Sequence, residues 1–465
     1  MIAADVIERV LNTARARGAS FAEVYCEDRR NVSVSYDDGR VDQVSNGRDR
    51  GAGIRVVRGE TTGYAHTADL SEASLLAAAQ AAADAAGAGD GGSHTVSLDG
   101  REPDRGVRRE VATSPLDVTK AARVALLEAA NDAARSVSSS IVQVSAGIGD
   151  SVKRVLIANT DGVFVTDEVT RVLFRISAVA DGDTGMQTGS ESLGHTMGWE
   201  IFDEVSVADL ARSAADQAVL KLRARPAPSG QMPVVIAKGT GGVLFHEACG
   251  HGLEADHVAK GASVYAGRVG ELVASPLVTL VDDGTVPGEW GTRSFDDEGH
   301  ATRRNVLIRD GVLVDYMWDH LRSAREGRPV SGNGRREDYT SLPMVRMTNT
   351  FVLAGPDDPD DIIASTPNGV YVARLGGGSV NTATGDFVFG MREAYLIENG
   401  RITEPLREGN LIGNGPQVLS DIDMLGNDFD MGGPGTCGKD GQGVPVGTGQ
   451  PTLRVASLTV GGTAA

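Results

Sequence analysis

The sequence predicts an α+β protein, with an N-terminal domain resembling an α/β sandwich and a β-dominated C-terminal domain that carries a single functional helix. Its 465 residues exceed what one hydrophobic core normally holds, so two domains are expected. Helical and strand-like periodicities mix in the first half, whereas short strands and turns dominate the second. We therefore expect domains at 1–225 and 226–465.

The N-terminal domain should begin with an amphipathic helix over 2–17 that ends at Gly18. The segment 87–115 is rich in Gly, Asp, Arg and Ser and buries little apolar surface, so we interpret it as a loop. The other expected elements are strands at 22–26, 32–36, 54–57, 141–147, 155–158 and 172–180, and helices at 72–86, 118–136 and 207–223.

A linker at 223–230 that contains two prolines marks the domain boundary. Beyond it we expect a strand at 234–237, a glycine-interrupted helix over 240–258, and a hairpin over 305–316 that turns at Arg309-Asp310-Gly311. The C-terminal domain is thus expected to be mainly antiparallel β.

Charge and composition narrow the function classes. The 44 Lys and Arg are outnumbered by 63 Asp and Glu, giving a formal net charge of −19, which disfavours nucleic acid and anionic membranes as partners. The first twenty residues lack the uninterrupted apolar run of a signal peptide, and no later run is long enough to span a bilayer. We expect a cytoplasmic protein.

The three cysteines are too few and too widely spaced for a disulfide framework. Cys26, on a predicted strand, is interpreted as a small buried hydrophobic residue. Cys249 and Cys437 lie in glycine-rich segments and are considered with the chemistry below.

The clearest local pattern is His246-Glu247-Ala248-Cys249-Gly250-His251, one residue longer than the H-E-x-x-H of common zinc peptidases. Residues five apart on a regular α-helix lie about 140° apart and cannot face one metal. A π-turn restores the alignment, and Gly250 and Gly252 supply backbone freedom for it. We predict a π-turn or a helix break at 248–252 in this metal-binding helix.

Two imidazoles leave a catalytic zinc ion one protein ligand short. Cys437 is the best candidate, because its glycine-rich loop can approach a metal closely and Lys439 would favour the thiolate. Cys249, Glu254 and His257 are the rival donors, and Glu254, three residues after His251, could instead accept a hydrogen bond from a ligand. If Glu254 bound as a fourth ligand, the site would be closed and structural.

Glu247 directly follows the first histidine and is the candidate catalytic residue. In a catalytic site it would act as the general base that takes a proton from a metal-bound water, which then attacks a peptide carbonyl.

The segment 246–254 resembles the signature of the TldD/PmbA family of metallopeptidases, in the TldD branch. Further segments similar to family motifs occur at 281–284, 332–336, 344–350, 393–400 and 437–439. The resemblance implies zinc on His246, His251 and Cys437, with Glu247 catalytic. Cys249 departs from it, because a small aliphatic residue is common there.

The resemblance also implies a partner and a substrate class. TldD-like chains pair with a metal-free sister subunit of the TldE/PmbA branch, and the active site lies in a cavity between the two. Members are associated with degrading unfolded peptides and with removing leader segments from modified peptide precursors. We therefore expect a heterodimer that acts on peptides.

Other interpretations stay open at this point. The chain could be a zinc-stabilised scaffold that binds peptides without cutting them, or a thiol hydrolase with Cys249 as nucleophile. The glycines of 375–380 could pair with an extended peptide or form a tight turn. Arg335 and Arg336 could clamp a substrate carboxylate or form a structural ion pair.

Overall fold

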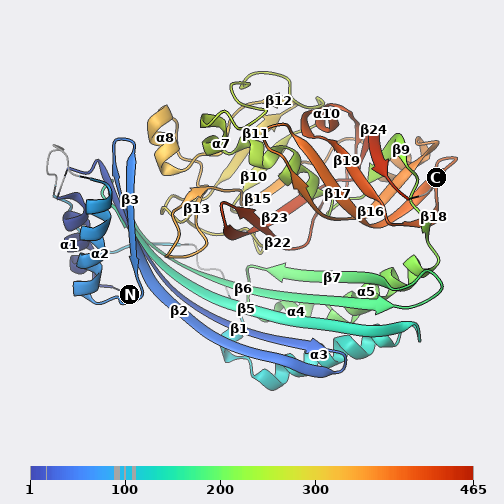
Figure 1. The fold of residues 1–465 in the computed structure, drawn as a ribbon, viewed down its shortest axis with the longest axis horizontal. Helices are drawn as coiled ribbons and strands as arrows, with labels where there is room; N and C mark the ends of the chain where they lie inside the picture. The colour runs from blue at the N-terminus through green and yellow to red at the C-terminus, as the bar shows by residue number, and fades with distance from the viewer. Residues whose placement is uncertain (1, 17, 88–94, 99–100, 107–110, 464–465) are drawn as a thin grey trace.

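A long, curved sheet forms the first part of the molecule (Figure 1). The computed structural model describes residues 2–16, 18–87, 95–98, 101–106 and 111–463. The strand order is β3-β2-β1-β5-β6-β4, with β7 paired to β6, and all pairings but that of β4 are antiparallel. The strands are β1 (Phe21–Asp37), β2 (Arg40–Arg58), β3 (Thr61–Thr67), β4 (Asp104–Arg105), β5 (Ile141–Asn159), β6 (Phe164–Ala180) and β7 (Gln187–His195).

These strands are longer than the sequence predicted. β1 joins the two strands expected at 22–26 and 32–36, and β5 joins those expected at 141–147 and 155–158. The polar run between the first two was misread as a break. It continues the strand because Glu27 is buried and pairs with Lys153 of β5 at 2.9 Å. β7 was not predicted at all.

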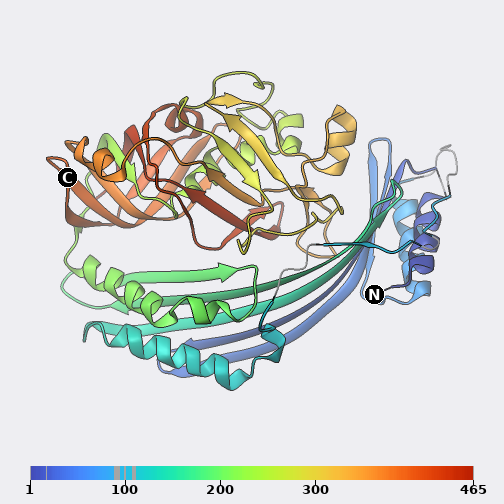
Figure 2. The same cartoon turned by 180° about the vertical axis from the view of Figure 1, so that it is seen from behind.

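The helices of this part follow the prediction closely. α1 (Ala4–Arg15) and α2 (Glu72–Ala85) pack on one end of the sheet, and α3 (Lys120–Arg135) and α5 (Val207–Leu222) pack toward its other end (Figures 1 and 2). The side chains of Ser71, Thr119 and Ser206 cap the N-termini of α2, α3 and α5. Two short helical segments, η1 (Pro115–Asp117) and α4 (Ile201–Glu204), complete it.

The loop predicted at 87–115 falls partly outside the described residues, at 88–94, 99–100 and 107–110. Its described remainder contains β4 and the first residue of η1.

The C-terminal part contains two larger sheets. The first has the order β16-β9-β24-β19-β17-β18-β8, with β20 on β24, and the second β12-β11-β10-β15-β23-β21, with β22 on β23. The strands of the first are β8 (Arg225–Pro226), β9 (Gly230–Ile236), β16 (Asn368–Val380), β17 (Asp386–Glu398), β18 (Arg401–Arg407), β19 (Asn410–Asn414), β20 (Ile422–Leu425) and β24 (Leu453–Gly461). Those of the second are β10 (Leu280–Asp283), β11 (Arg304–Arg309), β12 (Val312–Leu313), β15 (Asn349–Val352), β21 (Asp430–Met431), β22 (Gly435–Lys439) and β23 (Gln442–Gln450).

Short elements complete this part. They are the β13 (Gly334–Arg335) and β14 (Met344–Val345) pair and the helices α6 (Gly242–Phe245), α7 (Ala255–Ala259), α8 (His320–Glu326), α9 (Pro359–Ala364) and α10 (Gly415–Ser420). The hairpin predicted around Arg309-Asp310-Gly311 is confirmed as β11–β12. The α+β class and the dominance of β-structure are confirmed. Within the described residues, no helix is both long and apolar enough to cross a membrane.

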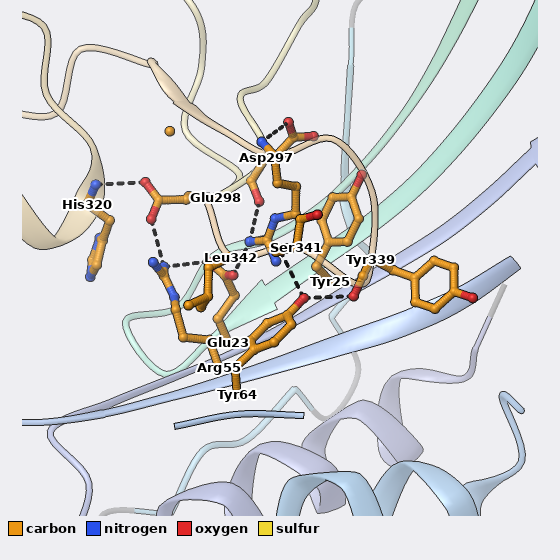
Figure 3. Close-up of polar contacts among 12 residues, drawn as sticks. Glu23, Tyr25, Arg55, Tyr64, Asp297, Glu298, His320, Tyr339, Ser341 and Leu342 are labelled. Carbon is orange, nitrogen blue, oxygen red and sulfur yellow. Dashed lines mark hydrogen bonds and ion pairs between the residues drawn. The ribbon is translucent and has the colours of Figure 1, made fainter. Parts of the chain in front are cut away.

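A buried network of charges joins the two parts (Figure 3). Arg55 of β2 donates to Glu23 of β1 at 3.0 Å and to Glu298 of the C-terminal part at 2.7 Å. Arg336 donates to Glu23 and stacks over the Tyr25 ring, with its guanidinium carbon 4.4 Å from the ring centroid. Because all these groups are nearly inaccessible to water, each charge depends on the others for stabilisation.

This network corrects one interpretation of the sequence. Arg335 and Arg336 are 1% and 2% exposed, so neither is available to clamp a substrate carboxylate. Arg335 donates to the carbonyl oxygens of Met347 and Pro445, and Arg336 pairs with Glu23. Both arginines are structural.

Candidate metal centre

The segment that carries the two motif histidines is a composite helix. α6 continues into a π-turn at His246–Gly250 and then a 3-10 turn at His251–Leu253, so the predicted π-turn is confirmed and begins two residues earlier than expected. This segment packs against β15 and β23 on one side and β16 and β17 on the other. The glycine-interrupted helix predicted over 240–258 is a series of short helical segments, and the chain is extended at Glu254 before α7 begins.

The glycines of this segment serve packing more than backbone freedom. Gly250 has an ordinary helical φ of −52°, but a Cβ there would lie 2.3 Å from Sδ of Met347. A Cβ on Gly252 would lie 2.7 Å from the Tyr265 ring. The helix can approach its neighbours only because both positions lack a side chain.

The structure brings His246, His251 and Cys437 together. One nitrogen of each histidine and the sulfur of Cys437 lie within 4.8 Å of one another, and Nε2 of His251 is 3.4 Å from Sγ of Cys437. The three residues are 3%, 8% and 4% exposed. Tetrahedral zinc with two nitrogen ligands and one sulfur ligand requires ligand atoms about 3.3–3.6 Å apart. The distance of 3.4 Å between Nε2 of His251 and Sγ of Cys437 lies in this range, so the donor set is compatible with a zinc ion.

The hydrogen bonding at these residues is also compatible with a metal. Nδ1 of His246 is buried and has no hydrogen-bond partner among the described residues. A soft thiolate with two imidazoles is a donor set that suits zinc better than magnesium or calcium.

Electrostatics favours the thiolate. Burial alone would raise the pKa of Cys437, but His246 and His251 beside it lower that pKa to about 4. Burial would likewise lower the pKa of His251, whereas the Glu254 carboxylate and Cys437 raise it well above its ordinary value. Cys437 is thus in the form that binds metals.

The rival donors have other contacts. Oε2 of Glu254 lies 3.1 Å from Nδ1 of His251, the ring nitrogen on the far side from Cys437. Glu254 forms a separate cluster with Asp256 and His257, in which Lys439 pairs with both carboxylates. The spacing of Glu254 from His251 allows either a metal ligand or a hydrogen-bond acceptor for His251, and the structure shows the second contact. The pairing of Glu254 with Lys439 was not recognised in the sequence.

Cys249 is fully buried, and its thiol donates to the carbonyl oxygen of Phe245 at 3.1 Å. Burial raises the pKa of this thiol far above its ordinary value. Because a nucleophilic cysteine requires an accessible thiolate, these features argue against a thiol hydrolase.

Glu247 is half-buried at the start of the π-turn, next to His246. Among the described residues, its carboxylate makes no hydrogen bond and no ion pair. It differs in this from Glu254, whose carboxylate contacts His251 and Lys439.

The glycine run of 376–378 lies within β16, so the alternative of a tight turn is wrong. β16 pairs with β9 only over Val370–Val372, and its pairing with β17 skips from Leu375 to Gly378. Gly377 and Gly378 are exposed, and β16 contacts the π-turn. An accessible stretch of strand therefore lies on the same element that packs against the π-turn.

Family models match nearly the whole chain. The model of the PmbA/TldA metallopeptidase C-terminal domain matches 229–462, that of the central domain matches 113–222, and that of domain 1 matches 22–86.

Individual relatives agree with these matches. The chain is 40% identical to a metalloprotease TldD homolog of Haemophilus influenzae, covering 96% of this chain and 94% of the relative. It is 37% identical to a TldD homolog of Buchnera aphidicola, with 96% and 94% covered, and 35% identical to a metalloprotease of Methanothermobacter thermautotrophicus, with 95% and 96% covered.

Solved structures share the fold. A protein from Thermotoga maritima, described as a putative modulator of a DNA gyrase, superposes with a TM-score of 0.78 at 21% identity, covering 98% of this chain and 99% of that one. TldE from Thermococcus kodakarensis superposes with a TM-score of 0.76 at 19% identity, with the same coverage.

Proposed function

The chain belongs to the PmbA/TldD metallopeptidase family, and from this premise we propose that it is a zinc-dependent peptidase that hydrolyses unfolded peptides or the leader segments of modified peptide precursors. The observation that carries the proposal is the convergence of His246, His251 and Cys437 at one buried point beside a half-buried, unpaired Glu247.

His246, His251 and Cys437 would hold the zinc ion. When bound, zinc supplies a Lewis acid that polarises a carbonyl group and makes water more acidic. Three protein ligands leave a position open for substrate or water, as in catalytic zinc sites. His251 is oriented by Glu254, which accepts from its Nδ1 and so leaves Nε2 for the metal.

Glu247 is proposed as the general base. Its carboxylate takes a proton from the attacking water and delivers it to the leaving amine. Glu247 directly follows His246 in the π-turn, so its backbone is adjacent to that of one proposed ligand.

The exposed part of β16 is proposed to bind the peptide. Gly377 has no heavy atom within 4 Å of where a Cβ would lie, so a substrate backbone can approach there without a side chain in the way. An extended peptide would pair with this edge as an additional strand. Pairing through the backbone suits unfolded substrates of varied sequence.

A sister subunit of the TldE/PmbA type is proposed as partner in a heterodimer. Support comes from the fold, because a chain described as TldE superposes over nearly its entire length. Related folds often associate through equivalent surfaces.

The scaffold alternative requires a fourth protein ligand, Glu254. In this structure Oε2 of Glu254 lies against Nδ1 of His251 and Nζ of Lys439, at 3.1 and 3.0 Å. These contacts favour the open, catalytic site.

Metal analysis of three proteins tests the proposal. The wild type should contain about one zinc per chain, and Cys437→Ser should lose both zinc and cleavage of a fluorescent unfolded peptide. Cys249→Ala is the matched control, because it removes a buried cysteine from the same site region and should keep both. Zinc retained in Cys437→Ser would move the third ligand elsewhere, and a metal-free wild type would contradict the proposal.

A further inference from the structure

We propose that Lys439 is a positioning residue of the metal centre, whose ammonium group fixes Glu254 and through it the ring of His251. This inference rests on the proposed function, because it concerns how the chain presents its ligands to a metal.

The ammonium of Lys439 has three acceptors, one for each of its N–H groups. They are Oε2 of Glu254 at 3.0 Å, Oδ1 of Asp256 at 2.7 Å and the carbonyl oxygen of Val345 at 3.0 Å. The side chain of Lys439 is only 4% exposed. The Lys439 ammonium therefore links β22 to Asp256 of α7, to Glu254 just before α7, and to Val345 of β14.

The positions of Lys439 and Cys437 on β22 relate the Lys439 contacts to the proposed metal ligands. Lys439 lies two residues after Cys437 on β22, so both side chains project from the same face of the strand. A single strand thus supplies one metal ligand and the anchor for the group that orients another. Any slip of β22 would displace both together.

Glu254 depends on this anchor. It is 0% exposed, and its Oε1 has no hydrogen-bond partner among the described residues. Its Oε2 is shared between Lys439 and Nδ1 of His251. Without the ammonium, a buried carboxylate would be left with His251 as its nearest donor and could shift toward other polar groups.

Glu254, Asp256 and His257 lie close enough to hold a cation of their own. The contacts of 2.7 and 3.0 Å show that the Lys439 ammonium occupies this position. The cluster is therefore assigned to orientation of His251 and not to a second metal.

Zinc affinity is the first test. Metal-free Lys439→Met, which keeps an unbranched side chain without the charge, is titrated with zinc in competition with a chromophoric chelator. Loss of an interaction that orients a ligand weakens metal binding by about 10- to 100-fold. Lys260→Met, on an exposed lysine just after α7, is the matched control and should bind as the wild type does. Equal affinity of Lys439→Met and the wild type would overturn the inference.

A double-mutant cycle separates positioning from a general structural role. If Lys439 acts through Glu254, the affinity lost in Lys439→Met with Glu254→Gln should be no greater than in Glu254→Gln alone. Losses that add would show that Lys439 acts independently of Glu254. With Co²⁺ in place of zinc, Lys439→Met should keep the thiolate charge-transfer band of Cys437 and change the ligand-field bands. Unchanged ligand-field bands would contradict the inference.

If Lys439→Met fails to unfold cooperatively, Asp256→Asn replaces it, because this change weakens one anchor of the ammonium and leaves Glu254 intact. It should reduce affinity in the same direction by a smaller factor, and an unchanged affinity would overturn the inference. A wild type that binds no zinc would refute the proposed function. Tight zinc binding that is unchanged in Lys439→Met would refute only this inference.

Discussion

Sγ of Cys437 lies 3.4 Å from Nε2 of His251, although 186 positions separate them in the sequence. The cysteine reaches the histidine because β22 folds back on β23, which pairs with β15 beside the composite helix. The candidate metal centre is thus assembled by tertiary structure, and its proposed third ligand depends on how the β22–β23 hairpin is held.

Arg346 holds that hairpin, and its removal should weaken metal binding. The fully buried guanidinium donates to the carbonyl oxygens of Cys437 and Gln442. Arg346→Met should lower zinc affinity in the chelator competition by about tenfold or more, because the thiolate loses its fixed position. Arg309→Met, on an exposed arginine of β11, should leave the affinity unchanged. Equal affinities of the two variants would contradict this role.

Arg336 should be important for global stability. Removing one partner of a buried ion pair costs about 3–5 kcal/mol, so Arg336→Met should lower the free energy of unfolding by this order in a denaturant titration. Arg154→Met breaks an exposed pair with Glu168 in the same sheet and should cost no more than about 1 kcal/mol. A small effect at Arg336 would show that the network joining the two parts contributes little.

Asp319 should make stability depend on pH. Burial and the nearby Glu298 carboxylate raise its pKa from 3.8 to about 7. Between these values the folded protein keeps a proton that the unfolded chain has released, so this group's contribution is complete below about pH 4 and is lost as the pH rises to about 7. Asp319→Asn keeps the side-chain cap of α8 and should remove this loss.

The measurement is the thermal midpoint from pH 4 to pH 8. Relative to the wild type, Asp319→Asn should gain stability as the pH rises. Asp358→Asn changes the exposed N-cap of α9 in the same way, and its thermal midpoint should vary with pH as that of the wild type does. If the Asp319→Asn curve also ran parallel, Asp319 would titrate normally.

Local geometry made part of the site predictable. The five-residue spacing of His246 and His251 allows few helical shapes that align them, so the π-turn followed from the sequence. The turn of the β11–β12 hairpin followed from an Asp-Gly pair, at which Asp310 adopts a positive φ, and Asp38 does the same in the β1–β2 turn.

Long-range pairing made the rest unpredictable. Glu23 and Arg55 lie on buried strand segments where apolar residues are expected, and they are tolerated because they pair with Glu298 and Arg336, which lie far away in the sequence. Arg336 is buried with them through its pair with Glu23, whereas an arginine without a known partner is expected at the surface. From the sequence Glu254 could be either a metal ligand or a hydrogen-bond acceptor for His251, because Lys439, which pairs with its carboxylate, is 185 positions away.

Glu247→Gln tests the central claim most directly. The variant and the wild type are compared for zinc content and for cleavage of a fluorescent unfolded peptide, with a TldE-type sister subunit added to both. The account predicts about one zinc per chain in each, with cleavage reduced by at least about 100-fold in the variant. Glu271→Gln, on an exposed glutamate, should cleave normally. Cleavage by Glu247→Gln at the wild-type rate would contradict the account.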